Sequence, residues 1–233
     1  MNNVSICMAV HNGEKYLHQQ LDSILPQLNK RDELIVSDDF STDNSLAIIR
    51  SYHDNRIKIL PPNKYNHPAK NFEYALNYCN QEIIFLADQD DVWHKNKLTV
   101  MKEELTICDL AVCDCRIVDE NLLQVHPSFF DLNHSRAGLL TNFIKSSFMG
   151  CCMAFRRDVL AHAFPFPQNA QMHDQWIGLV AERYYKVHFI PIVLVDHRRH
   201  SHNYSSTSAK SNFSFYDKIS MRFHLAKNLL LKQ

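Results

Sequence analysis

The stretch Ile83–Trp93, IIFLADQDDVW, places three carboxylates directly behind a run of apolar residues. The apolar run has the length of a buried strand. Carboxylates this close repel one another, so their charge must be screened by open solvent or neutralised by a cation. The stretch therefore predicts a strand of the core that ends in a polar loop able to hold a cation.

The same pattern recurs through the first half of the chain. Apolar runs of strand length lie at 4–10, 33–39, 56–60 and 82–88, and amphipathic stretches of helix length lie between them at 14–28, 44–53 and 70–79. Strands that alternate with helices predict right-handed βαβ units and a mainly parallel, doubly wound sheet. Such a sheet binds ligands beyond the carboxyl ends of its strands. Three polar clusters follow predicted strands and should meet at that edge: 9–12, 38–39 and 88–91.

Composition excludes several classes of protein. The 233 residues fit one domain with appendages, and the balance of 25 basic and 25 acidic residues gives no indication of a nucleic-acid partner. Seven cysteines without a CxxC pair, behind a start that lacks a basic leader, are typical of a cytoplasmic protein with reduced thiols. No apolar run approaches the roughly 20 residues that span a bilayer.

Glycine is scarce, and this excludes two kinds of nucleotide site. With only four glycines, the chain contains neither a GxGxxG fingerprint nor a P-loop. The phosphates of a nucleotide ligand would then need a divalent metal, and carboxylates at a strand end are suitable ligands for Mg²⁺ or Mn²⁺.

Four segments resemble the family 2 glycosyltransferases, which have the GT-A fold. They are VSICMAVHNGEKYLHQQLDSIL (4–25), ELIVSDDFSTDNS (33–45), IIFLADQDDVWHKNKL (83–98) and MHDQW (172–176), in the order of that family. Acid clusters are common in loops, but this one together with the DDFSTD element is specific. LADQDDVW and HDQW are most similar to bacterial rhamnosyl-, glucosyl- and galactosyltransferases of O-antigen and capsule assembly.

The resemblance implies a nucleotide-sugar donor site at the strand ends. Asp39, with Asp38 beside it, would accept a hydrogen bond from the N3–H of uracil or thymine. Asp90 would bind the Mn²⁺ or Mg²⁺ that bridges the donor phosphates, and Asp88 would contact the ribose or a metal-bound water. The other implied donor residues are Ala9, His11, Asn12, Gln89, Arg198 and Arg199, with His200 as a metal or diphosphate contact. A helix-capping turn is the alternative for Asp38 and Asp39.

Sugar transfer needs one more carboxylate, because a base must deprotonate the incoming hydroxyl. The resemblance implies Asp174 as this base, at the start of a helix whose dipole would keep it ionised; a helix cap is the alternative. Many family members carry Glu where this chain has His173, which would tune Asp174 or hold the acceptor. The other implied acceptor-side residues are Met149, Gly150, Cys151 and Trp176. The first three lie in a predicted strand within 146–160, which also fits a plain core strand.

The C-terminal segment from Phe213 to Leu231 interleaves apolar and basic residues, with Asp217 as its only acid. This pattern predicts a basic amphipathic helix that lies on an anionic membrane, or one that packs on the body or a partner subunit.

We therefore predict an α/β protein with the GT-A fold. The predicted glycosyltransferase domain is 1–210, with a nucleotide-binding half at 1–105 and an acceptor half at 106–210, and the tail is 211–233. The predicted activity is inverting, metal-dependent transfer from a UDP- or dTDP-sugar to a glycan or lipid-linked glycan. The enzyme would act in the cytoplasm or at the cytoplasmic face of the inner membrane, with a homodimer left open. The alternatives are a non-catalytic nucleotide-sugar or cation-binding domain, and a sugar nucleotidyltransferase, which normally requires a glycine-rich first loop.

Overall fold

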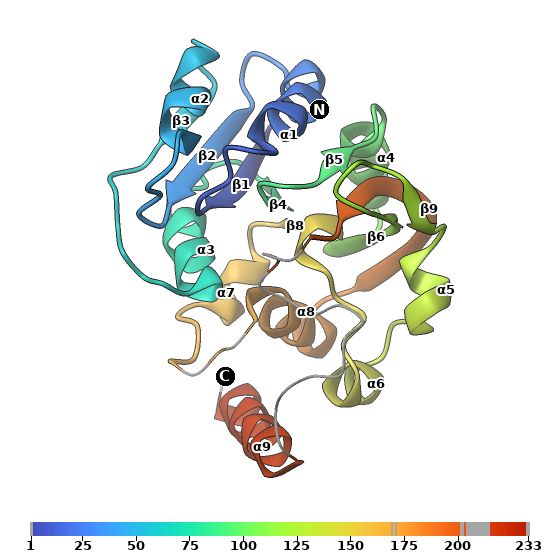
Figure 1. The fold of residues 1–233 in the computed structure, drawn as a ribbon. Coiled ribbons are helices and arrows are strands. Elements are labelled where there is room, and N and C mark those ends of the chain that lie inside the picture. The colour runs from blue at the N-terminus through green and yellow to red at the C-terminus, as the bar shows by residue number, and fades with distance from the viewer. Residues whose placement is uncertain (1, 169, 171, 201–202, 204–214, 232–233) are drawn as a thin grey trace.

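The computed structural model describes residues 2–168, 170, 172–200, 203 and 215–231. The strands of these residues form one sheet in the order β3-β2-β1-β4-β8-β6-β9-β5, with β7 paired to β6 (Figure 1). The predicted α/β architecture with flanking helices is therefore confirmed.

The first half of the chain builds parallel βαβ units. The strands are β1 (Val4–Val10), β2 (Glu33–Asp38), β3 (Ile57–Ile59) and β4 (Ile83–Ala87), and the helices are α1 (Leu17–Ile24), α2 (Ser45–Ser51) and α3 (Pro68–Leu76). A short 3₁₀ turn, η1 (Leu25–Gln27), extends α1. The pairs β1–β2, β1–β4 and β2–β3 are all parallel. Because the order β3-β2-β1-β4 reverses direction after β3, right-handed crossovers put α1 and α2 on one face and α3 on the other.

The second half adds antiparallel pairs to this sheet. Its strands are β5 (Val92–Trp93), β6 (Leu110–Val118), β7 (Gln124–His126), β8 (Met153–Arg156) and β9 (Val187–Arg198). Its helices are α4 (Lys97–Glu104), α5 (Phe129–Asn133), α6 (Leu139–Ile144), α7 (Val159–Ala163) and α8 (His173–Tyr184). β8 is antiparallel to both β4 and β6, whereas β6 and β9 are parallel. The predicted strand within 146–160 is shorter than expected, because Gly150–Cys152 forms a 3₁₀ turn, η2, ahead of β8.

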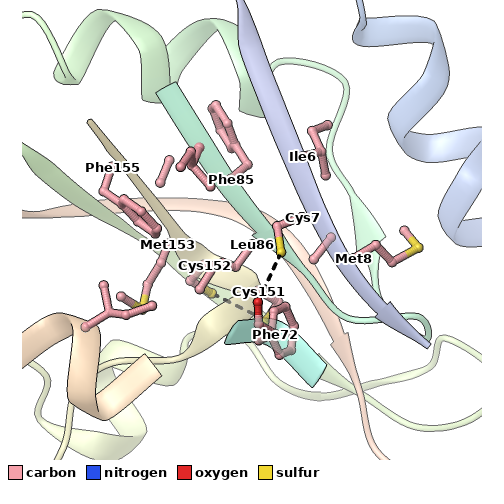
Figure 2. Close-up of a cluster of buried hydrophobic side chains, with 14 of the residues drawn as sticks. Ile6, Cys7, Met8, Phe72, Phe85, Leu86, Cys151, Cys152, Met153 and Phe155 are labelled. Carbon is pink, nitrogen blue, oxygen red and sulfur yellow. Dashed lines mark hydrogen bonds between the residues drawn. The ribbon is translucent and has the colours of Figure 1, made fainter. Parts of the chain in front are cut away.

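The core lies where β1, β4 and β8 meet the helices. Figure 2 shows Cys7 of β1 beside Leu86 of β4 and the Cys151–Met153 segment. The Cys7 thiol lies 4.0 Å from the carbonyl oxygen of Phe72 in α3. All seven cysteines are buried free thiols, as the composition predicted.

The C-terminal helix, α9 (Phe215–Leu231), lies beside α8 and α6 at one end of the molecule (Figure 1). Arg183 of α8 donates to the carbonyl oxygen of Leu229 at 2.7 Å, and Arg222 of α9 donates to that of Ile144 at 2.6 Å. No helix among the described residues combines the length and apolar character needed to cross a bilayer.

Candidate active site

A cavity of about 590 Å³ opens at the carboxyl ends of β1, β2 and β4. The three predicted polar clusters meet there, because the parallel strands all end at that edge. Ten of the residues predicted for the site line this cavity: Ala9, His11, Asp39, Asp88, Gln89, Asp90, Met149, Gly150, His173 and Asp174.

Gln89 joins the loops that follow β1 and β4. Its side-chain oxygen accepts from the backbone N–H of His11 at 2.7 Å, and its amide nitrogen donates to the carbonyl of His11 at 2.9 Å. A Cβ at Gly13 would lie 2.6 Å from that side-chain oxygen, so any other residue would force the Gln89 side chain to move. The amide of Gln89 is thus used to hold the two loops together.

The Asp39 carboxylate is buried at the cavity wall with room for one more donor. Oδ1 accepts from the backbone N–H groups of Tyr65 at 2.6 Å and Asn66 at 3.1 Å, and Oδ2 accepts from that of His67 at 3.2 Å. A carboxylate offers about four lone-pair positions, two on each oxygen. One position on Oδ2 therefore remains for a ligand N–H.

Asp38 and Asn12 hold loops and lie outside the cavity lining. The Asp38 carboxylate accepts from the backbone N–H of Ser41 at 2.9 Å and from its hydroxyl at 2.5 Å. This turn lies ahead of α2, whose N-cap is Asn44. The side-chain oxygen of Asn12 accepts from the backbone N–H of Thr42 at 2.8 Å. Both residues therefore hold the loops at the strand ends, and their contacts with the donor stay predictions.

The acid cluster after β4 converges with the segment that follows β9. Oδ2 of Asp90 accepts from Nε2 of His200 at 2.8 Å and from the side-chain amide of Asn203 at 3.1 Å. Burial, and then the charges of Asp91 and Asp90, raise the pKa of Asp88 well above its usual value. Because a cation would relieve this repulsion, the two carboxylates suit a divalent metal, whereas Nε2 of His200 contacts Asp90 and does not complete a group of three metal ligands with them.

Asp91 and His197 form a buried pair behind this cluster. Oδ1 of Asp91 accepts from Nδ1 of His197 at 2.9 Å and from the backbone N–H of Arg198 at 3.0 Å. Burial opposes ionisation of both groups, but the charge of Asp91 raises the pKa of His197 well above its usual value, and the charge of His197 lowers the pKa of Asp91. We interpret the pair as an imidazolium–carboxylate contact that fixes the end of β9 against the acid loop.

The Cys151 thiol lies 3.8 Å from Nδ1 of His197. Asp91, Cys151 and His197 form the one group of three among the described residues that could hold a metal ion. The direct contact between Asp91 and His197 already uses one ligand atom of each. Cys151 is fully buried and outside the cavity lining, so its predicted contact with the acceptor is corrected to packing.

The two arginines after β9 also lie outside the cavity lining. The guanidinium of Arg198 donates to the carbonyl oxygens of Asp90 and Glu120, both at 2.8 Å, and to the side chain of Gln19. It also lies 4.6 Å from the centre of the Tyr16 ring. Arg198 thus supports the loop that carries Asp90, and its predicted contact with the leaving group stays a prediction. Burial lowers the pKa of Arg199, and its donor role stays a prediction.

Asp174 lies in the first turn of α8, with its carboxylate on the cavity. Oδ2 accepts from the backbone N–H of Gly150 at 3.1 Å, and Oδ1 accepts from that of Gln175 at 2.7 Å. The helix start was expected to keep this group ionised, but burial outweighs these donors and raises its pKa to about 6. A carboxyl group with this pKa is a suitable general base near neutral pH.

His173 lies beside Asp174 and stays neutral. Its ring stacks on Phe72 with centroids 3.8 Å apart, and burial lowers its pKa to about 3. Neither ring nitrogen has a hydrogen-bond partner among the described residues. A Cβ at Gly150 would lie 2.8 Å from Nε2 of His173, so this glycine is needed to make room for the histidine.

Trp176 was predicted on the acceptor side, but it lies in the core. It is fully buried, and its indole N–H donates to the carbonyl of Ala163 at 2.8 Å. The sequence reasoning also missed His197, although the run DHRRHSHN contains it three residues before His200.

Comparison with known proteins gives a consistent result. The family model "Glycosyl transferase family 2" matches residues 5–164. The dTDP-rhamnosyl transferase RfbG of Shigella flexneri is 27% identical over 95% of this chain and 79% of its own length. The glucosyltransferase WfgD of Escherichia coli, named for the substrates UDP-Glc and α-D-GlcNAc-diphosphoundecaprenol, is 36% identical over 77% of this chain and 70% of its own.

Two solved structures share the fold. S. aureus TarS 1–349 in complex with UDP-GlcNAc superposes with a TM-score of 0.74 at 21% identity, over 99% of this chain and 67% of that one. The mannosyltransferase PcManGT of Pyrobaculum calidifontis, in complex with GDP-Man and Mn²⁺, superposes with a TM-score of 0.66 at 18% identity, over 87% and 59% of the two chains.

Proposed function

Because the chain belongs to glycosyltransferase family 2, we propose that it moves a sugar, with inversion, from a UDP- or dTDP-sugar to a glycan or lipid-linked glycan of the bacterial surface. The observation that carries this proposal is one cavity that holds Asp39, Asp90 and Asp174 on its wall. The names of RfbG and WfgD, which specify a dTDP-sugar and a UDP-sugar enzyme, support the donor class.

The base of the donor would be recognised at Asp39. The free lone-pair position of its carboxylate matches the N3–H of uracil or thymine, which cytosine lacks. The backbone donors from Tyr65, Asn66 and His67 fix the carboxylate, so its orientation is set before the ligand arrives. A preorganised acceptor loses less freedom on binding.

The diphosphate would lie at Asp88 and Asp90, which would hold Mn²⁺ or Mg²⁺, and the metal contact of His200 stays a prediction. When bound, such a cation supplies positive charge to the departing diphosphate. Arg198 and Asp91 fix the loop that carries Asp90, so the ligand atoms are held by buried contacts.

Asp174 would act as the base in a single displacement. The acceptor oxygen attacks the anomeric carbon while its proton passes to the Asp174 carboxylate, and the electron pair of the broken C–O bond leaves on the nucleoside diphosphate. Attack opposite the leaving group inverts the anomeric centre. Since His173 is neutral and its ring nitrogens are unpaired within the described residues, it can orient the acceptor hydroxyl.

The two halves of the catalytic domain would divide these tasks. Residues 1–105 would contribute the donor side with Asp39 and Asp90, and residues 106–210 would contribute the acceptor side with Asp174.

We also propose that α9, in the tail 211–233, lies on the cytoplasmic face of the inner membrane, because Phe223 and Leu230 are 66% and 69% exposed beside basic residues. Homodimer formation stays a prediction.

A donor screen tests the proposal. UDP- and dTDP-sugars are offered with Mn²⁺, and binding and slow hydrolysis are measured with the wild-type chain and with Asp90→Asn. We expect binding of a UDP- or dTDP-sugar that depends on the metal and is weakened by the substitution. Binding without hydrolysis or transfer would favour the non-catalytic alternative, and activity that is unchanged in EDTA would contradict the metal assignment.

A further inference from the structure

A second groove lies along a different face of α3 from the one that lines the active-site cavity. Its volume is about 270 Å³, and its described lining includes Tyr65, Lys70, Tyr74, Asn77 and Gln168. The active-site cavity instead uses Asn71 and other residues at the start of the helix. The helix therefore separates two concave surfaces that share its N-terminal end.

Tyr65 and Tyr74 line this groove, and the ring of Tyr78 continues the row beyond its described lining. The ring centres of Tyr65 and Tyr74 are 5.7 Å apart, and those of Tyr74 and Tyr78 are 5.2 Å apart in an edge-on contact. Tyr65 and Tyr74 are half-buried, while Tyr78 is 41% exposed. Partly exposed tyrosines present an apolar face with a polar tip, which matches a sugar ring with its C–H face and hydroxyl rim.

Polar groups along the groove are available for hydroxyls. The Lys70 ammonium and the Gln168 amide are exposed and make no hydrogen bond to another described residue. Asn77 uses its amide nitrogen to donate to the carbonyl of Glu73 at 2.8 Å, and its side-chain oxygen has no described partner. An aromatic row flanked by amide and ammonium donors is typical of a surface that binds carbohydrate rather than an apolar partner.

Both walls of the groove include residues that are near residues of the active-site cavity along the chain or by a hydrogen bond. On one wall, the backbone N–H of Tyr65 donates to Oδ1 of Asp39, which lines the cavity. On the other wall, Phe166 and Ala170 lead towards Met172, which lines the cavity immediately before the helix that carries Asp174. Neighbouring segments of the chain thus line both the groove and the active-site cavity.

We propose that this groove binds the sugars of the acceptor glycan beyond the one that receives the new sugar. The inference rests on the proposed glycosyl transfer and adds to it a preference for acceptors of several sugars. The rings of Tyr65 and Tyr74 stack on the distal sugars, and Lys70 and Gln168 bond their hydroxyls. The last residue of the acceptor lies at Asp174.

The test is an array of bacterial surface oligosaccharides printed with their component monosaccharides. We expect the whole chain to bind at least one oligosaccharide better than its monosaccharides. Tyr74→Ala should weaken that binding by about two- to tenfold, the range expected for one ring contact. Leu123→Ala is the control, because it removes an exposed apolar side chain that lines neither the groove nor the active-site cavity, and it should bind like the wild type.

The UDP affinity in Mn²⁺ is measured on the same samples and should be unchanged by Tyr74→Ala. Equal binding of oligosaccharides and monosaccharides, or wild-type glycan binding by Tyr74→Ala, would overturn the inference. If Tyr74→Ala does not fold, Lys70→Ala and Gln168→Ala replace it, because both side chains are exposed. Each should weaken oligosaccharide binding and leave UDP affinity unchanged. Absence of UDP binding in every sample, the wild type included, would refute the proposed nucleotide-sugar donor instead. The array would still show whether the groove binds oligosaccharides.

Discussion

Replacement of Asp174 by asparagine should abolish most turnover while making the folded protein more stable at neutral pH. The pKa of this carboxyl is raised from 3.8 to about 6 by burial, so the folded state holds the charged form at a cost. Each pKa unit corresponds to about 1.4 kcal/mol, so the cost at pH 7 is of order 3 kcal/mol. The asparagine side chain of the variant carries no charge and avoids this cost.

The hydrogen bonds reduce that gain. The two carboxylate oxygens accept from the backbone N–H groups of Gly150 and Gln175, and an asparagine side chain offers only one acceptor oxygen. One lost hydrogen bond removes about 1 kcal/mol. A net gain of about 1–2 kcal/mol at pH 7 remains.

The pH dependence of this difference identifies the cause. Well below a pH of 3.8 the carboxyl is protonated in both the folded and the unfolded wild-type protein, so the penalty is absent. As the pH rises from there to about 6, the unfolded chain loses its proton while the folded protein still holds it, and the stabilising contribution of the protonated form is lost. The stability advantage of Asp174→Asn should therefore grow across this range and level off above it.

Urea unfolding of both proteins from about pH 4 to about pH 7, together with turnover, measures these quantities. Turnover of the wild type should rise with pH through about 6, and Asp174→Asn should lose about 10²- to 10⁴-fold. Glu103→Gln, which changes an exposed carboxylate on α4, is the control and should alter neither quantity. A stability difference that is constant with pH, or near-normal turnover of Asp174→Asn, would refute the assignment of Asp174 as a buried base.

Three further predictions concern the metal, the buried pair and the tail. Asp90→Ala should abolish transfer and Mn²⁺-dependent donor binding, with little change in the free energy of unfolding. Isothermal titration of the variant with UDP in Mn²⁺ measures this, and wild-type UDP affinity would contradict the metal assignment. His197→Gln removes one partner of a buried ion pair with Asp91 and should cost about 3–5 kcal/mol in urea unfolding, whereas a cost below about 1 kcal/mol would mean that the pair is not ionised. The intact chain should sediment with anionic vesicles, and this binding should weaken as the salt concentration rises. A chain truncated after Ser211 should no longer sediment with the vesicles but should still hydrolyse the donor. Hydrolysis lost on truncation would show that α9 is a packing element.

The sequence predicted the parts of the fold that depend on local pattern. The apolar runs at 4–10 and 83–87 became β1 and β4, because continuous apolar residues of strand length are buried on both faces of a parallel sheet. The acids that follow these runs then had to meet at one edge. Convergence of the donor-side clusters was therefore predictable without any long-range information.

The directions of side chains on β9 were not predictable. β6 and β9 pair in parallel across a long stretch of chain, and their register shifts twice around Asp114. A shift of one residue turns a side chain from one face of a sheet to the other. The orientation of His197 towards Asp91, and of Arg198 towards Gln19, follows from these irregularities. The strand sequence alone contains no signal for them.

Several polar groups with unused bonding capacity line the cavity at the carboxyl ends of the strands. Asp39 keeps one lone-pair position, both ring nitrogens of His173 lack a described partner, and the charges of Asp90 and Asp91 raise the pKa of Asp88. A buried polar group without a partner costs about 1–3 kcal/mol, so a sequence selected for stability alone would not concentrate such groups on one wall. Each of these groups matches one part of the proposed reactants: a pyrimidine N–H, an acceptor hydroxyl and a divalent cation. The cost that these groups impose on the free protein is offset when the reactants bind, so binding of donor and acceptor should stabilise the folded state.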